Sequence, residues 1–186
     1  LLHVVGRITG RELTDWKLEG ELRDIVRARE NINEDRFDRL VKECPVLDLP
    51  DPMTFAEFAT RASSAMATPV HLESLQIERL LREREEESST ALSETVAVPH
   101  IVLDEPGHFS LLLCRCAGGI SFGEDARGVK AVFVLMGSRD ERNFHLRALA
   151  AIAQIVQEPD FEKKWLAAKG ERGLRDLLLT TVRRRG

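Results

Sequence analysis

Apolar and polar positions follow helix-like and strand-like periods in alternation along most of the chain. Apolar residues recur at helical spacing in four segments: 36–43, 55–68, 71–86 and 143–157. Mostly apolar runs, typical of buried strands, occupy five further segments: 46–49, 96–98, 101–103, 109–116 and 131–136. Because predicted strands alternate with predicted helices, the pattern indicates an α/β fold.

Cap and turn residues divide these segments. Thr54, followed three residues later by Glu57, is a capping box that predicts the start of a helix. Thr68-Pro69 predicts the end of that helix, because proline interrupts helical hydrogen bonding. The pair Gly118-Gly119 predicts a turn after the strand that begins at Phe109.

The segment 143–157 predicts a helix whose first turn contains His145. Its predicted inner face consists of apolar residues at helical spacing: Leu146, Leu149, Ala150, Ala153 and Val156. A helix N-terminus attracts anions through its unpaired amides and its dipole, so a histidine there can help to hold a phosphate. The alternative is a polar side chain that faces water.

The first 35 residues differ from the rest. Residues 1–10 are apolar with two glycines, and Leu18, Leu22, Ile25 and Val26 then recur at helical spacing. This predicts an amphipathic helix that packs on the main domain or on a partner, or a chain-end helix docked only in a crystal lattice. We therefore predict a helical extension over 1–35 and one domain over 36–186. Since the chain begins with leucine, we expect it to be a fragment of a longer protein.

Composition narrows the function classes. Apolar residues make up 43% of the chain, enough for a core, and the net charge of −4 argues against a general nucleic-acid binder. No run of about 18 apolar residues and no signal peptide are present. The three cysteines suit a reducing cytosol, and no ligand spacing suggests a metal or another cofactor. The run Arg183-Arg184-Arg185 predicts a frayed basic tail.

The stretch 88–100 carries the candidate chemistry. A polar loop leads into the short strand Val96-Ala97-Val98, which Pro99 ends, so His100 is expected at the rim of a sheet. Arg84 precedes this histidine by sixteen residues. A histidine has an ordinary pKa of about 6.5, so its neutral ring can accept a phosphoryl group near pH 7. The alternative is a surface histidine without a special role.

Three motifs carry a family resemblance. They are V-A-V-P-H at 96–100 after a helix that ends in R-E, G-I-S-F-G at 119–123, and E-R-N-F-H at 141–145. Over about residues 40–182 the chain resembles the type-2 (fructose/mannitol/nitrogen) enzyme IIA domain of the bacterial phosphotransferase system. The resemblance implies a mixed β-sheet flanked by helices, with the histidine at one sheet edge.

The resemblance also implies roles for four residues. His100 would carry the phosphoryl group on Nε2, and Arg84 would neutralise the phosphate. His145 would be the second active-site histidine, and Glu94 would be the carboxylate of the pocket network. One departure is Ile101, where sugar-transporting members often have glycine. We expect this branched side chain to narrow the space for a donor protein.

Three hypotheses follow for the function. The extension before residue 36 and the motif combination resemble the cytosolic C-terminal tails of bacterial transporters, among them amino-acid permease-like and ion-transport proteins. In the first hypothesis the domain regulates such a transporter from the cytoplasmic face of the membrane, and its partners are a spanning part upstream of Leu1 and a phosphocarrier resembling HPr. In the second it passes phosphate from phospho-HPr to an enzyme IIB. In the third its pocket is vestigial and it assembles subunits. The transported solute, the phosphate donor, the oligomeric state and the direction of regulation stay open.

Overall fold

The computed structural model describes residues 21, 25 and 34–185, and the helical extension predicted over 1–35 lies almost entirely outside them. The described helices are α3 (Arg36–Glu43), α4 (Phe55–Val70), α5 (Ser74–Glu87), the 3-10 helix η1 (Arg139–Glu141), α6 (Arg142–Val156), α7 (Phe161–Ala167) and α8 (Gly170–Thr180). The strands are β1 (Val46–Leu49), β2 (Met53–Thr54), β3 (Val96–Ala97), β4 (His100–Leu103), β5 (Phe109–Ser121) and β6 (Val129–Ser138). Within residues 34–185, no helix combines the length and the apolar character needed to cross a membrane.

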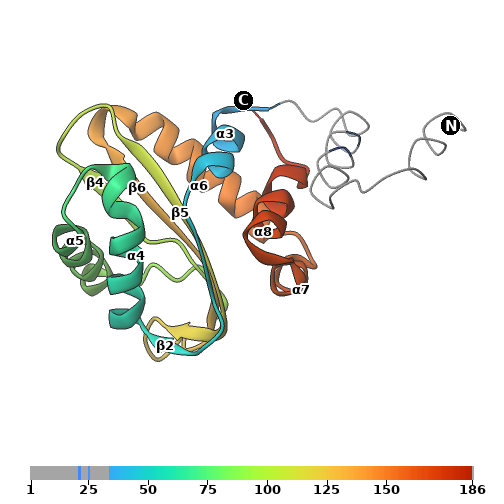
Figure 1. Cartoon of the computed structure of the whole chain (residues 1–186), viewed down its shortest axis with the longest axis horizontal. Coiled ribbons are helices and arrows are strands. Elements are labelled where there is room, and N and C mark those ends of the chain that lie inside the picture. The colour runs from blue at the N-terminus through green and yellow to red at the C-terminus, as the bar shows by residue number, and fades with distance from the viewer. Residues whose placement is uncertain (1–20, 22–24, 26–33, 186) are drawn as a thin grey trace, which may run out of the picture.

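The strands form one open sheet built around the antiparallel pair β5 and β6. β1 and β2 run parallel to β5 on one side of this pair, and β3 and β4 run parallel to β6 on the other. α4 and α5 cover one face of the sheet, and α3, α6, α7 and α8 cover the other (Figure 1). The predicted fold class, a mixed sheet flanked by helices, is therefore confirmed.

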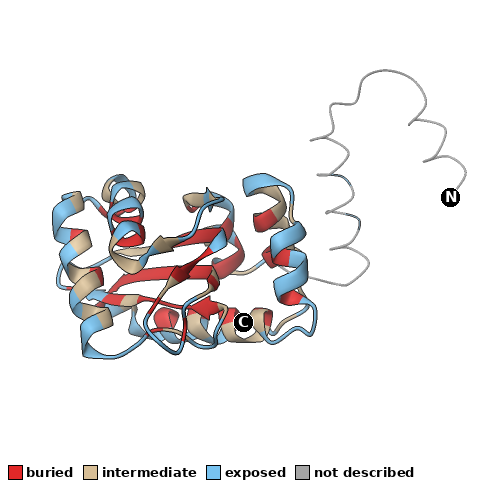
Figure 2. Cartoon of the chain, turned by 90° about the horizontal axis from the view of Figure 1, so that it is seen from below, coloured by how far each residue is buried: buried red, intermediate tan, exposed pale blue. Residues whose placement is uncertain are grey.

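Alternation along the central strands supplies two apolar cores. Leu111 and Leu113 of β5 face the α3, α6, α7 and α8 side, whereas Leu112, Cys114 and Cys116 face α4 and α5. All five side chains are fully buried, and Figure 2 shows buried residues running through the sheet between the two helical layers. Cys114 and Cys116, two residues apart in β5, therefore share one face of the strand.

Helix α4 begins where the sequence predicts it but runs past its predicted end. The Thr54 hydroxyl accepts from the Glu57 N–H, and the Glu57 carboxylate accepts from the Thr54 N–H, so the capping box is present. Pro69 lies inside the last turn, and the helix continues to Val70 and ends at His71, which has a left-handed φ of 58°. A proline there removes only one N–H from the end of the helix, so the turn closes without it.

The prediction of a turn at Gly118-Gly119 is wrong, because both glycines lie within β5. The register of β5 against β6 shifts between Arg115 and Ile120, and Gly119 has a φ of +89°. A Cβ atom on Gly118 would lie 2.2 Å from the backbone nitrogen of Pro52. The glycines therefore allow a bulge at a point where the chain before β2 crosses closely over the strand.

The predicted inner face of the helix after residue 142 is only partly right, because Leu149 and Val156 pack against the core whereas Leu146 and Ala150 are exposed. The buried residues of α6 are Phe144, His145, Ala148, Ala151, Ile152 and Ile155, whereas Leu146 is 56% exposed. Small and apolar residues occur around most of this helix, so spacing alone left its orientation ambiguous. The large side chains of Phe144, Ile152 and Ile155 decide it by packing on the sheet, and this rotation carries His145 inward.

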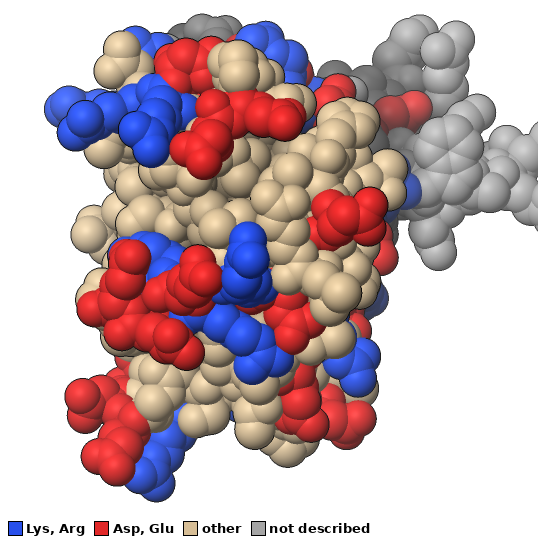
Figure 3. Space-filling view, turned by 90° about the vertical axis from the view of Figure 1, so that its left-hand side faces the viewer, with Lys and Arg blue, Asp and Glu red and all other residues tan. Residues whose placement is uncertain are grey.

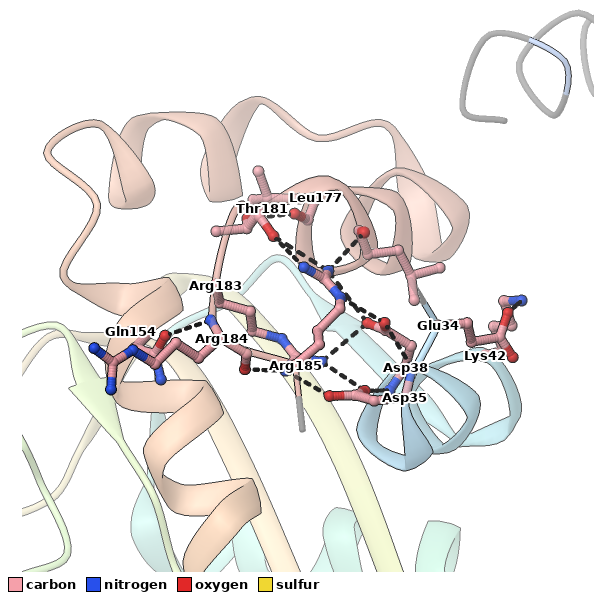
Figure 4. Close-up of polar contacts among 11 residues, drawn as sticks. Glu34, Asp35, Asp38, Lys42, Gln154, Leu177, Thr181, Arg183, Arg184 and Arg185 are labelled. Atoms are coloured by element: carbon pink, nitrogen blue, oxygen red, sulfur yellow. Dashed lines mark hydrogen bonds and ion pairs between the residues drawn. The ribbon is translucent and has the colours of Figure 1, made fainter. Parts of the chain in front are cut away.

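The C-terminal arginines are not frayed, which corrects that prediction. Arg183 donates to both Asp35 and Asp38, and Arg185 donates to Asp38 with an Nε to Oδ2 distance of 2.7 Å (Figure 4). The side chains of Arg183 and Asp38 are 1% and 0% exposed. We call these four residues the terminal clasp. It joins the N-terminus of α3 to the end of the chain, and its two positive charges match its two negative ones.

Candidate functional site

His100 is the first residue of β4 and is half-buried at the sheet rim. Pro99 separates it from β3, yet both short strands pair with β6 in the same register, Val96 opposite Ala131 and His100 opposite Leu135. The break leaves the Val98 carbonyl 3.0 Å from the Nδ1 atom of His100. The imidazole thus lies where the sequence predicts it, held by a backbone group two residues earlier.

These contacts define one consistent tautomer of the His100 ring. A carbonyl oxygen can only accept, so Nδ1 carries the hydrogen and donates it to Val98. Nε2 of the same ring then carries a lone pair. The Nη2 atom of Arg84 lies 3.2 Å from Nε2, and because a guanidinium can only donate, Nε2 accepts.

Arg84 reaches His100 from the last turn of α5. Its Nη1 atom also donates to the carbonyl and the hydroxyl of Ser88, each at 3.1 Å. The carboxylate beside it, Glu85, accepts instead from the backbone N–H and the hydroxyl of Thr90, and so fixes the loop after α5. Among the described residues, Arg84 has no carboxylate within ion-pair distance.

His145 lies in the first turn of α6 and is 7% exposed. Its ring centroid is 5.8 Å from that of His100 and 5.6 Å from that of Phe109. Its Nε2 atom is buried without a hydrogen-bond partner among the described residues. Burial, and to a lesser extent the charge on His100, lowers the pKa of His145, so this ring is neutral near pH 7.

The two histidines open into a recess of about 600 Å³. Its lining also includes Arg139, Arg142 and the apolar side chains of Val102 and Leu146, which are 57% and 56% exposed. Sequence reasoning missed both arginines. Their place at the start of the helix that carries His145, Arg142 as its first residue and Arg139 three residues earlier, was the signal that could have found them, since this end of a helix already favours anions.

Figure 3 shows the face of the molecule on which α5 lies. Charged side chains of both signs follow α5 across the middle of this face, and a band of uncharged surface separates them from a second charged group above. Part of the charge on α5 is paired within the helix, as between Arg82 and Glu78 and between Arg79 and Glu83. The acidic end of this helix is therefore partly neutralised.

The structure does not bring every predicted residue together. Glu94 is exposed and makes no hydrogen bond or ion pair with the described part of the chain. Ile101 is 5% exposed and packs in the core on the α4 and α5 side, so the prediction that it narrows the entrance is wrong. Strand alternation places Val102, not Ile101, on the same side as His100. Within residues 34–185, His, Cys, Asp and Glu form no group of three that could hold a metal ion.

The open mixed sheet, with a histidine at its rim that an arginine contacts, indicates the class of protein to which a family model also assigns the chain. The family described as phosphoenolpyruvate-dependent sugar phosphotransferase system, EIIA 2, matches residues 61–180. This match covers more than half of the chain, and the chain therefore belongs to that family.

Individual relatives agree with this assignment. The mannitol-specific phosphotransferase enzyme IIA component of Bacillus subtilis is 33% identical over 95 residues, which are 50% of this chain and 64% of that protein. The nitrogen regulatory protein of Bradyrhizobium diazoefficiens is 31% identical over 100 residues, which are 53% of this chain and 65% of that protein. The chain thus spans just under two thirds of the length of these two relatives.

Solved structures share the fold. The nitrogen regulatory protein IIA-Ntr from Neisseria meningitidis superposes with a TM-score of 0.65 at 20% identity, covering 72% of this chain and 91% of that one. The IIA mannitol structure from Escherichia coli gives 0.58 at 16% identity, covering 72% and 94%. An Escherichia coli complex of enzyme IIA mannitol with phosphorylated enzyme IIB gives 0.57 at 16% identity, covering 72% and 92%. The predicted enzyme IIA type-2 membership is confirmed.

Proposed function

We propose that His100 is a phosphoryl acceptor and that the domain regulates a membrane transporter according to its phosphorylation state. The observation that carries the acceptor role is the pair of contacts on the His100 ring. The Val98 carbonyl fixes the proton on Nδ1, and Arg84 marks the place in front of Nε2 where an anion would lie. A nucleophile and a positive charge are thus aimed at the same point.

The transfer needs no group beyond the donor and the ring. The lone pair on Nε2 attacks the phosphorus atom of a donor phosphohistidine, and the new N–P bond forms as the N–P bond to the donor breaks. The donor ring leaves with the electron pair of that bond. Nδ1 of His100 keeps its hydrogen on the Val98 carbonyl, which stabilises the positive charge that the ring gains.

Neighbouring groups fit the product. A bound phosphoryl group carries roughly two negative charges, and the Arg84 guanidinium can turn from Nε2 to its oxygens and offer two parallel donors. Arg139 and Arg142 line the same recess. Nε2 of His145 has no partner, and an unpaired buried polar atom is unfavourable by about 1–3 kcal/mol. A phosphoryl oxygen would supply the missing partner when Nε2 carries the hydrogen.

The surface beside His100 supports a protein as the donor. Val102 and Leu146 are large apolar side chains that are more than half exposed at the recess. Exposed apolar side chains that lie together, with polar groups beside them, often mark protein contact sites. We propose a phosphocarrier resembling HPr as the donor.

The regulatory role rests on the resemblance to transporter tails and on the extension before residue 36. In this proposal residues 1–35 connect a spanning part upstream of Leu1 to the domain of residues 36–186, which lies on the cytoplasmic face. A second candidate function is a working carrier that passes phosphate to an enzyme IIB, and the sugar-specific relatives favour it. The coding sequence upstream of Leu1 separates the two. A spanning domain there supports regulation, and an adjoining IIB-like domain supports the carrier.

The acceptor role is tested by labelling with radioactive phosphoenolpyruvate, enzyme I and HPr. We expect the wild type and the His108→Ala control to take up acid-labile phosphate, and His100→Ala to take up none. His108 is a suitable control because it lies outside the recess. Equal labelling of the wild type and His100→Ala would refute the acceptor role. A folded wild type that takes up no phosphate would favour an assembly role with a vestigial pocket.

A further inference from the structure

Arg36 connects α3 to the start of the helix that carries His145. Its Nη1 and Nη2 atoms donate to the two carboxylate oxygens of Glu141 at 2.6 and 3.0 Å. Glu141 is the N-cap residue of α6, yet its side chain makes no capping hydrogen bond to that helix. This carboxylate is thus committed to Arg36, and the first turn of α6 is fixed from outside.

The same guanidinium group reaches the histidine through a row of aromatic rings. The Cζ atom of Arg36 lies 4.0 Å from the ring centre of Phe144. Phe144 meets Phe109 edge-on at 4.7 Å between centroids, and Phe109 meets His145 edge-on at 5.6 Å. Edge-to-face contacts of this kind are directional, so the position of one ring restricts the next.

Arg36 itself is held in a firm frame. The residues on either side of it in the first turn of α3, Asp35 and Asp38, belong to the terminal clasp and are bound by Arg183. Beyond the clasp, the backbone N–H of Arg184 donates to the side chain of Gln154 on α6 at 2.9 Å (Figure 4). α3, the chain end and α6 are therefore joined at one place, and Arg36 extends from that joint toward the site.

We propose that Arg36 is a positioning residue for His145. It holds Glu141 and covers Phe144, and so fixes the first turn of α6 at the orientation that places the His145 ring beside His100. The inference rests on the proposed function for its purpose, because the orientation matters if a phosphoryl group binds between the rings.

Stability alone would not explain this arrangement. The side chain of Arg36 is 48% exposed and that of Glu141 is 23% exposed. Exposed ion pairs contribute about 0–1 kcal/mol to folding. Removing the Arg36 contacts should therefore leave the domain folded while the His145 ring gains freedom, and the two effects can be measured separately.

The test follows the titration of the His145 ring by NMR in the wild type, Arg36→Gln and Arg39→Gln. Arg39 is a matched control, because it is an exposed arginine on the same helix without a partner in the described part of the chain. The titratable and charged groups that line the recess with the His145 ring are His100 of β4, Arg139 of η1 and Arg142 of α6, and all three are unchanged in these variants. We expect the pKa of His145 to rise toward its ordinary value in Arg36→Gln, because a looser first turn admits water.

A reversed pair, Arg36→Glu with Glu141→Arg, should return the titration toward that of the wild type. Arg36→Lys, which keeps the charge without the planar fork, should do so only in part, and it replaces Arg36→Gln if that variant does not fold. A His145 titration that is the same in Arg36→Gln and Arg39→Gln would overturn the proposal. The titration of His145 does not require phosphoryl transfer. Failure of His100 to accept label would therefore refute the proposed function, whereas the positioning role of Arg36 is decided by the NMR titration alone.

Discussion

The terminal clasp and the histidine site both place arginine beside polar groups, but they satisfy it differently. In the clasp, the guanidinium groups of Arg183 and Arg185 meet the carboxylates of Asp35 and Asp38, and their charges cancel. In the site, Arg84 meets a neutral ring nitrogen and the oxygens of Ser88. In the first arrangement the charges are balanced, whereas the second retains a positive charge with no carboxylate beside it among the described residues.

Burial explains why the two regions differ. A buried charge is strongly unfavourable unless it is paired and hydrogen-bonded, and the Arg183 side chain is only 1% exposed. Arg84 is half-buried at the rim, where water can solvate it until a ligand binds. The comparison teaches that the partner of an arginine, more than its place in a motif, separates a structural role from a binding role.

Breaking the clasp should have the largest effect. Asp38→Asn removes a fully buried carboxylate that binds both clasp arginines. Loss of one partner from a buried ion pair typically destabilises a protein by about 3–5 kcal/mol, and we expect that loss here in urea unfolding. Asp104→Asn is the control, because the Asp104 side chain is 92% exposed and is paired with Arg139, whose side chain is 80% exposed. If the two variants unfold at the same urea concentration, the clasp does not hold the domain together.

Removing Arg84 should have the opposite effect, a large loss of phosphoryl uptake with little loss of stability. Arg84→Ala leaves a folded domain, because its contacts lie at the rim, but we expect phosphoryl uptake at His100 to slow about 10²-fold, as for loss of one charge-stabilising donor. Arg84→Lys should recover part of the rate, since it keeps the charge without the fork. Initial labelling rates and a thermal melt measure the two properties. A large loss of stability with an unchanged rate would assign Arg84 to the structural class.

Lowering the pH should weaken the terminal clasp, with a smaller effect than either of the two substitutions above. Burial pushes the pKa of Asp35 upward, but hydrogen bonds from Arg183 and the Asp38 N–H, with the charges of Arg183 and Arg185, outweigh it and leave the pKa below its usual range. A lowered folded pKa means that Asp35 stabilises the fold above about pH 4, the ordinary pKa of Asp, and loses this contribution below it. The difference in unfolding free energy between the wild type and Asp35→Asn should thus be full at pH 7 and shrink below pH 4. A constant difference between pH 7 and pH 3 would contradict this.

The smallest effect should come from Glu94. Its carboxylate is exposed and contacts neither Arg84 nor His100, although the family resemblance predicts a place for it in the pocket network. We expect Glu94→Gln to slow labelling less than Arg84→Ala does. A slowing as large as that of Arg84→Ala would show that the loop closes on the site when phosphate arrives.

Most of the fold could be predicted from local signals in the sequence. Capping residues, strand-ending prolines and the period of apolar residues predict the α/β fold class and the bounds of α3. They failed where the deciding contact was distant in sequence. Gly118 allows a bulge because Pro52 approaches it, and α6 turns its Phe144 face inward because the sheet receives that ring.

The candidate site likewise has some features that the sequence predicted and others that depend on contacts distant in sequence. The family resemblance paired His100 with Arg84 sixteen residues earlier, and the structure brings the two side chains into contact between the last turn of α5 and the start of β4. The burial of His145 and the use of Arg139 and Arg142 depend on how α6 is rotated, which no local pattern determined. The clasp was invisible for a related reason, because its partners lie more than 140 residues apart.

The carbonyl that holds Nδ1 of His100 belongs to the main chain. No side-chain substitution can delete it, so the tautomer of the His100 ring is protected from most point mutations and depends on the path of the polypeptide between β3 and β4. Only a change that restores a continuous ladder there, such as the loss of Pro99, or one that lengthens the gap, would free the imidazole to exchange its two nitrogens. The break between β3 and β4 therefore determines which nitrogen of the His100 ring carries the hydrogen, as much as the histidine itself does.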